Sequence, residues 1–347
     1  MKDLLELQRK IVPEIIDILE KRYIILRNIY YNQPIGRRAL ANSLNVGERV
    51  IRTEVSVLKE QGLLCIETNG MNVTEEGRLI IERLKDYIHG LKGLNNLEKK
   101  IQDMLNINRV YIVPGDSSED IITFKDMGKT ASLLIKQLIK DGDIIGITGG
   151  TTMAQVAEEM TADKNKKDVL VIPARGGLGK DLETQSNNIA ASLAKKIGGS
   201  YRLLQVPDNV GGEALKALMT VHEIKEVLDM IKNMNVLIFG IGRADVMAQR
   251  RELEPDKIEK IKKEGAVAEA FGHYFNTDGN IVLETSTIGL SLDDFKGIDT
   301  VIGVASGKEK AEAIIAISKL HSNMTLVIDE GAARKILTMS KNATISK

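Results

Sequence analysis

The spacing of hydrophobic residues changes once along the chain, between residues 90 and 98. Before that point, apolar residues recur at helical spacing, which predicts helices over 3–20, 21–31, 35–43, 48–61 and 74–90. After it, short apolar runs rich in β-branched residues alternate with longer amphipathic stretches. We therefore predict two domains, 1–90 and 98–347, joined by a linker over 91–97.

The C-terminal pattern predicts an α/β fold. The apolar runs expected to form strands are 110–113, 144–147, 169–172, 202–206, 236–239, 301–304 and 325–328. Stretches with helical spacing lie at 124–140, 152–160, 184–197, 212–232, 244–250, 308–319 and 331–339. Nearly continuous apolar strands separated by helices are typical of a doubly wound, mainly parallel sheet with both faces covered.

The N-terminal pattern predicts a winged helix-turn-helix. Two short helices joined by Asn45-Val46-Gly47 have the spacing of a helix-turn-helix. Asn69-Gly70, between two apolar runs, predicts a β-hairpin directly after them, where a wing would lie. The residues expected to contact operator DNA are Arg37, Arg38, Arg49, Arg52, Thr53 and Ser56.

The distribution of charge favours DNA as the partner of this domain. Residues 21 to 59 contain eight Lys/Arg and two Asp/Glu, although the formal net charge of the whole chain is zero. This local excess of positive charge fits a phosphate-binding surface. A helical protein-binding module with a solvated basic face is the alternative. With 3% aromatic residues, the chain is not expected to stack single-stranded bases.

The composition indicates the cellular compartment of the protein and argues against disulfide and metal sites. The single cysteine, Cys65, rules out an intramolecular disulfide and fits a reducing compartment. The chain begins without an apolar signal core and contains no apolar run long enough to span a membrane, so we expect a cytoplasmic protein. One cysteine and four scattered histidines form no ligand cluster, so no metal site is expected and a metal or redox sensor is set aside.

A glycine-rich turn predicts a phosphate site in the second domain. Gly149-Gly150 follows the run 144–147, and Thr151-Thr152 begins a helix that one of these threonines is expected to cap. Glycine allows close approach to a ligand, and a helix N-terminus attracts anions. Such turns also occur in α/β domains that bind nothing there. Nucleotide binding is not indicated, because the stretch is neither GxGxxG nor a Walker A loop.

Other predicted strand ends carry basic residues near glycines. Arg175 follows one strand and Lys310 lies beyond another, while Arg250 belongs to an intervening segment. Several cations at one edge of a sheet suggest a polyanionic ligand, and Glu269 or Gln185 would accept hydrogen bonds from sugar hydroxyls. Each arginine taken singly also fits an ordinary surface position.

Several stretches together resemble one family, the SorC branch of bacterial sugar-responsive transcription regulators. They are Gln33–Arg38, Ile147–Thr152, Pro173–Gly179, Met247–Arg251, Glu269–Gly272 and Asp329–Ala333. The resemblance covers essentially the whole chain. It implies an N-terminal winged helix-turn-helix and an effector domain similar to phosphosugar isomerases and deaminases.

The resemblance also implies a mechanism: a repressor of glycolytic genes, tetrameric on DNA, that fructose 1,6-bisphosphate releases without any cofactor. One phosphate would lie on Gly149, Gly150, Thr151, Thr152 and Arg175. The remaining contacts would come from Arg250, Glu269 and Lys310, with Gln185 and Ser306 as further candidates.

An enzyme is the alternative, because the same fold permits a phosphosugar isomerase or deaminase. That chemistry needs a carboxylate base and usually a histidine acid, for which Glu269, Asp329 and His273 are the candidates. None of the four histidines forms an obvious acid–base pair in the sequence. We therefore expect no catalytic residue.

Overall fold

The computed structural model describes residues 11–162, 168–176, 181–206, 212–285 and 287–345. It divides into two compact units, Met1–Asn95 and Asn96–Lys347, which we call the N-terminal and C-terminal units. The predicted linker over 91–97 is largely helical in the structure. Helix α5 (Glu75–Leu91) ends at its first residue, and α6 (Leu94–Leu105) begins inside it, so only Lys92 and Gly93 separate the two helices.

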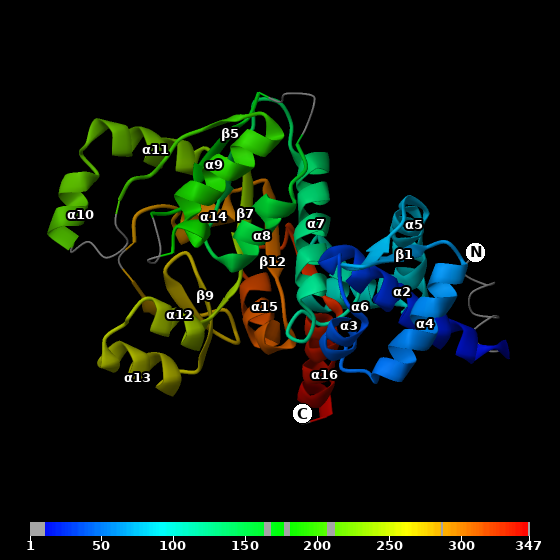
Figure 1. Cartoon of the computed structure of the whole chain (residues 1–347). Helices are drawn as coiled ribbons and strands as arrows, with labels where there is room; N and C mark the ends of the chain where they lie inside the picture. The colour runs from blue at the N-terminus through cyan, green and yellow to red at the C-terminus, as the bar shows by residue number, and fades with distance from the viewer. Residues whose placement is uncertain (1–10, 163–167, 177–180, 207–211, 286, 346–347) are drawn as a thin grey trace. The chain divides into compact units, whose positions relative to one another are not determined.

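The N-terminal unit has the element order of a winged helix-turn-helix (Figure 1). Besides α5, its elements are α2 (Pro13–Asn32), α3 (Arg37–Ser43), α4 (Glu48–Glu60), β1 (Leu64–Glu67) and β2 (Gly70–Val73). The predicted helices over 3–20 and 21–31 are one continuous helix from Pro13, a residue well suited to a first helical position. The part of the first prediction before residue 11 lies outside the described residues.

The hairpin turn lies one residue earlier than predicted. Glu67 pairs with Gly70 in the antiparallel ladder, so Thr68-Asn69 forms the turn and Gly70 begins the second strand. Gly70 has φ +143°, and a Cβ there would lie 2.9 Å from the backbone nitrogen of Ile35. Glycine is therefore required by the close approach of Ile35 to the hairpin, rather than by the turn itself.

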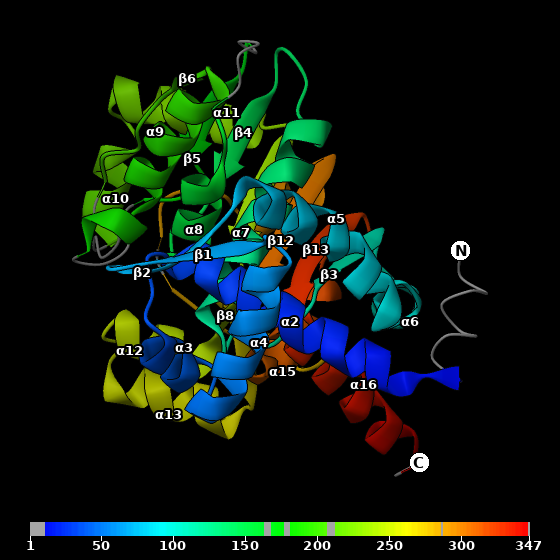
Figure 2. The same cartoon turned by 45° about the vertical axis from the view of Figure 1, so that its right-hand side comes forward.

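The C-terminal unit is built on a seven-stranded parallel sheet of order β3-β13-β12-β7-β4-β5-β6. Its strands are β3 (Arg109–Val113), β4 (Ile144–Ile147), β5 (Leu170–Pro173), β6 (Ser200–Tyr201), β7 (Val236–Gly240), β12 (Thr300–Ala305) and β13 (Met324–Asp329). Figure 2 shows β13 beside β3 and β12. The predicted strand over 202–206 is wrong, because only the two residues before it pair with β5.

Helices pack against this sheet, as the doubly wound prediction requires. Alternate residues of β7 divide between the faces, because successive strand side chains point in opposite directions. Val236 and Ile238 join the core under α7 (Ile121–Leu138), α8 (Thr151–Glu159) and α9 (Ser186–Ile197). Phe239 instead packs on Phe295 of α14 (Leu292–Lys296), with ring centroids 5.8 Å apart.

The remaining helices refine the predicted boundaries. The stretch 212–232 forms two helices, α10 (Gly212–Leu218) and α11 (His222–Lys232), and 308–319 forms the 3-10 turn η2 (Lys308–Lys310) followed by α15 (Ala311–Ser318). The other elements are η1 (Leu182–Thr184), α12 (Ala244–Arg250), α13 (Pro255–Lys263) and α16 (Glu330–Ile345).

A second sheet was not predicted. It has four antiparallel strands in the order β11-β10-β9-β8: β8 (Gly242–Arg243), β9 (Ala266–Ala270), β10 (His273–Asn276) and β11 (Ile281–Glu284). Asp278-Gly279, between the runs that form β10 and β11, is the signal that would have indicated a hairpin. This small sheet brings Glu269 to the site described next.

Candidate functional site

The site lies at the switch point of the large sheet. Strands β4 and β7 are neighbours, but the chain continues from them toward opposite edges. The crevice outside the carboxyl ends of two such strands is where open α/β sheets bind ligands. Thr148 joins the two ends here: its amide donates to the carbonyl of Ile238 at 3.1 Å, and its hydroxyl accepts from the Gly240 amide at 3.2 Å.

A cavity of about 550 Å³ opens at this point. Eight of the ten predicted effector residues line it: Gly149, Gly150, Thr151, Thr152, Arg175, Arg250, Glu269 and Lys310. Gln185 and Ser306 are not among the lining residues. Gln185 immediately precedes α9 and follows Thr184, which does line the cavity, and Ser306 follows β12. The volume is within the range of small-molecule sites.

The glycine turn fits the structure for a different reason from the predicted one. A Cβ on Gly149 would lie 2.7 Å from the carbonyl oxygen of Thr184, and the Gly150 amide donates to that oxygen at 2.8 Å. The close approach is therefore to the chain before α9. The predicted threonine cap is wrong, because Gly150 is the N-cap and no side chain caps α8. Thr151 and Thr152 occupy the first turn, where helix amides have no intrahelical acceptor.

Two buried arginines face one buried carboxylate beside the cavity. Arg251 Nη2 donates to Glu269 Oε1 at 2.5 Å, and Arg175 Nη1 lies 3.5 Å from the same oxygen. The Gly272 amide also donates to this oxygen, at 2.8 Å. Phe271 and Gly272 both have positive φ, as a tight two-residue turn between β9 and β10 requires. The turn thus aims a backbone donor at Glu269.

The backbone of Arg175 is held by segments distant in sequence. Arg175 forms a bridge with Gly289, and its carbonyl accepts from the Ser186 hydroxyl at 2.9 Å. A Cβ at Gly289 would lie 2.5 Å from the Arg175 Cα, so glycine is needed for this contact. The guanidinium is consequently presented from a fixed backbone, although 177–180 of the predicted motif lie outside the described residues.

Arg250 and Lys310 add positive charge to a cavity whose lining also holds the carboxylates of Asp181, Glu252 and Glu269. Burial lowers the pKa of Lys310, and the nearby positive charges of Arg250 and Arg243 lower it further, while Glu309 and Asp329 oppose the change. An anionic ligand would favour the charged form of Lys310. Arg251 lines the cavity together with Arg250, although only Arg250 was predicted as a site residue. Only burial distinguishes them: Arg251 is 8% exposed, and Arg250 is exposed.

The three candidate residues for enzyme chemistry, Asp329, His273 and Glu269, are not arranged as an acid–base pair in the cavity. Asp329 is fully buried, and its carboxylate accepts from the amides of Ser117, Gly307 and Ala332. His273 is not among the residues that line the cavity; its Nδ1 lies 3.2 Å from the carbonyl of Phe271. Glu269 is engaged by Arg251, as described above.

Most of the predicted DNA-contacting residues are exposed in the N-terminal unit. Arg38, Arg49, Arg52, Thr53 and Ser56 are exposed, and Arg37 is half-buried. Three of the eight counted cations have other roles, since Arg27 is buried and both Lys21 and Arg22 hold Glu54. Burial alone would raise the pKa of Glu54, but hydrogen bonds from Arg22 and Lys21 lower it.

The described residues contain neither a membrane-spanning helix nor a cluster of potential metal ligands. No helix among them is both long and apolar enough to cross a membrane. Likewise, no group of three or more His, Cys, Asp or Glu side chains in that part of the chain is placed to hold a metal ion.

Residues 89–338 match a sugar-binding domain family, and residues 18–88 match the CggR N-terminal DNA-binding domain. The chain is 44% identical to the central glycolytic genes regulator of Bacillus subtilis strain 168, over 97% of this chain and 99% of that protein.

Solved structures of transcriptional regulators are also similar to this chain. A SorC-family transcriptional regulator from Enterococcus faecalis is 38% identical, covers 70% of this chain and 99% of its own, and has a TM-score of 0.66. The full-length sorbitol operon regulator SorC of Klebsiella pneumoniae has the same fold, with a TM-score of 0.66 and 17% identity over 90% of this chain and 96% of its own. The predicted fold class is thereby confirmed. This chain belongs to the SorC family of transcriptional regulators, with a DNA-binding domain followed by a sugar-binding domain.

Proposed function

We propose that the protein is a repressor of glycolytic genes that binds operator DNA through its N-terminal unit and is released by fructose 1,6-bisphosphate bound in its C-terminal unit. The observation that carries the proposal is the cavity: Arg175, Arg250, Arg251 and Lys310 surround it beside the uncapped N-terminus of α8. A ligand with two phosphates matches several cations better than a neutral sugar does. The name of the Bacillus subtilis relative supports the glycolytic pathway.

In this proposal, one phosphate binds the first turn of α8 and Arg175, where Gly149–Thr152 line the cavity. Helix amides and a forked guanidinium are both well suited to a phosphate. Arg250 and Lys310 bind the second phosphate. Glu269 orients Arg175 and Arg251, and its second carboxylate oxygen is the candidate acceptor for a sugar hydroxyl.

The ligand can weaken operator binding only if it binds one arrangement of the subunits more tightly than another. We therefore propose a homo-oligomer, a tetramer on DNA, in which binding of the bisphosphate shifts the contacts between subunits.

A phosphosugar isomerase is the second candidate, and the engagement of its candidate residues disfavours it. Asp329 accepts from three backbone amides, and His273 is not among the lining residues of the cavity. A general base needs an accessible lone pair within reach of the substrate. We therefore propose that the chain is not an enzyme. Turnover of fructose 6-phosphate or glucosamine 6-phosphate by the purified protein would contradict this.

The deciding experiment measures binding of the full chain to a duplex that the chain itself selects from a random library. Fluorescence anisotropy at one salt concentration gives the Kd with and without saturating fructose 1,6-bisphosphate. We expect at least a tenfold weaker Kd with the bisphosphate and less change with fructose. An unchanged operator affinity at saturating bisphosphate would contradict the proposal.

A further inference from the structure

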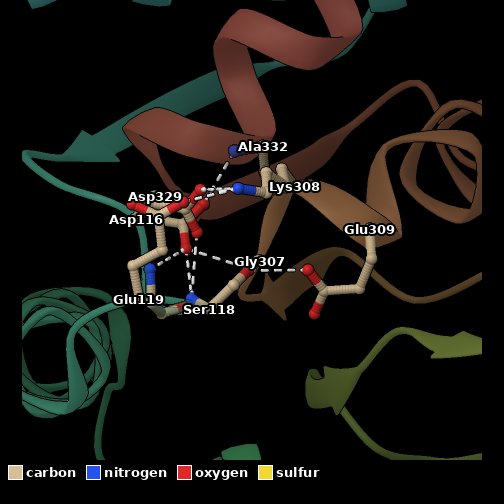
Figure 3. Close-up of polar contacts among 9 residues, drawn as sticks. Asp116, Ser118, Glu119, Gly307, Lys308, Glu309, Asp329 and Ala332 are labelled. Atoms are coloured by element: carbon tan, nitrogen blue, oxygen red, sulfur yellow. Dashed lines mark hydrogen bonds and ion pairs between the residues drawn. The ribbon is translucent and has the colours of Figure 1, made fainter.

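Asp329 joins two loops and the first turn of α16 at the carboxyl edge of the sheet (Figure 3). Its Oδ1 accepts from the Ala332 amide at 2.8 Å, which caps the first turn of α16. Its Oδ2 accepts from the Gly307 amide at 2.8 Å, and from the amide and hydroxyl of Ser117 at 2.9 and 2.5 Å. One buried carboxylate therefore connects the segments that follow β3, β12 and β13.

A second layer of contacts ties the same segments together farther out. The Ser118 hydroxyl donates to Glu309 Oε2 at 2.7 Å, and Lys308 Nζ donates to Glu119 Oε1 at 2.6 Å. Gly307 has φ +96°, and a side chain there would collide with the Glu309 carboxylate. Residues 307–309 are thus fixed against 116–119 by hydrogen bonds and by a backbone conformation that favours glycine.

Lys310 is the next residue along the chain, and it ends the turn η2 at the cavity. The direction of its side chain depends on the conformation of the three residues before it. We propose that Asp329 is a positioning residue for the anionic ligand: it holds residues 307–309 against 116–119, so that Lys310 is presented to the cavity.

This inference rests on the proposed binding of a sugar bisphosphate. It adds Asp329 to the residues that affect this binding, although Asp329 is not among the described residues that line the cavity. It also gives Asp329 a role that needs no proton transfer. A carboxylate that accepts from four hydrogen-bond donors is held in one orientation. A fixed acceptor is what a positioning residue requires, whereas a catalytic base must exchange protons.

The test is a double-mutant cycle on the full chain, with the Kd for fructose 1,6-bisphosphate measured by isothermal titration calorimetry. Lys310→Met removes the ammonium group. Asp329→Asn replaces one accepting carboxylate oxygen by an NH2 group, which cannot accept from the donors that surround it. We expect Asp329→Asn to weaken binding about tenfold, or about 1.4 kcal/mol, in the wild-type background. With Lys310→Met already present, we expect less than a twofold further loss, because the positioned group is gone.

Asp143→Asn is the matched control, because Asp143 also accepts from a backbone amide, that of Lys140 at 2.7 Å, but precedes β4 at the opposite edge of the sheet. It should leave the Kd unchanged. An equal loss from Asp329→Asn in both backgrounds would overturn the inference, because a general loss of structure does not depend on Lys310.

Should Asp329→Asn fail to fold, the hydrogen bond from Ser118 to Glu309 provides a second test of the inference. Ser118→Ala removes the hydroxyl that Glu309 accepts from, and we expect binding about threefold weaker, with recovery in Ser118→Thr. No change in Ser118→Ala would then count against the inference. If Lys310→Met binds the bisphosphate more weakly than the wild-type chain does, but neither the Asp329 nor the Ser118 variants change the Kd, only the positioning role fails. A wild-type chain that binds no bisphosphate defeats the proposed function as well.

Discussion

Arg251 and Glu269 form a hydrogen-bonded ion pair of 2.5 Å in which each side chain is only 5% exposed. Arg175 lies near the same carboxylate oxygen, so two guanidinium groups face one carboxylate beside the cavity. The local excess of positive charge is what an incoming phosphate would balance. The pair therefore links the stability of the C-terminal unit to the affinity for its ligand.

Glu269→Gln should destabilise the C-terminal unit by about 3 kcal/mol, because two buried guanidinium groups lose the carboxylate that they face. Arg251→Gln should cost less, because Arg175 still faces Glu269. Urea unfolding followed by circular dichroism measures both. Glu284→Gln, on the exposed part of β11, serves as the control and should change the free energy of unfolding by less than about 0.5 kcal/mol. A larger loss from Arg251→Gln than from Glu269→Gln would contradict this account.

Arg175→Lys should weaken the binding of fructose 1,6-bisphosphate by roughly 10- to 100-fold, because lysine keeps the charge but loses the forked geometry. Operator affinity without the sugar should persist. Titration calorimetry gives the first quantity and anisotropy the second. Arg202→Ala, at an exposed position, is the comparison variant. A normal bisphosphate response from Arg175→Lys and Arg175→Ala would mean that the phosphate site lies elsewhere.

Arg52→Ala should weaken operator binding and leave bisphosphate binding intact, because Arg52 lies on the exposed face of α4. If it contacts one phosphate, the slope of log K against log salt should fall by about 0.9. Salt titrations of operator affinity measure this slope. Arg78→Ala, on α5 of the same unit and paired with Glu75 and Glu82, should leave the slope as it is. Equal slopes for wild type and Arg52→Ala would remove Arg52 from the DNA contact surface.

Binding of the bisphosphate should weaken as pH rises through the lowered pKa of Lys310. The free site is neutral at Lys310 above that pKa, while the bound phosphate favours the ammonium form, so binding takes up a proton there. The charged groups facing Lys310 are Glu309, Asp329, Arg250 and Arg243.

Calorimetry in buffers of different ionisation enthalpy would detect this proton uptake. Measurements above about pH 7 avoid the second ionisation of the phosphates, near pH 6. Lys310→Met should bind more weakly and with no pH dependence in this range. The same pH dependence in Lys310→Met would assign the proton to another group.

The sequence by itself determined the elements whose local signals are strong. Helical spacing and turn residues indicated the helix-turn-helix, and apolar runs indicated β4, β7, β12 and β13, because periodicity and burial act over a few residues. The strand, Gly149-Gly150 and helix order also located the cavity, since parallel strands place their carboxyl ends at one edge. Eight of the ten residues predicted to bind an effector line this cavity.

Only the tertiary structure decided which of two adjacent arginines is buried and why particular glycines are required. Arg250 and Arg251 are chemically alike in the sequence, and the packing of α12 against the small sheet selects Arg251 for the ion pair with Glu269. Gly70 and Gly289 permit contacts with Ile35 and Arg175, residues far away along the chain. Asp329 likewise acquires its partners from the loops after β3 and β12 and from the first turn of α16. Such contacts depend on long-range proximity, which local spacing does not encode.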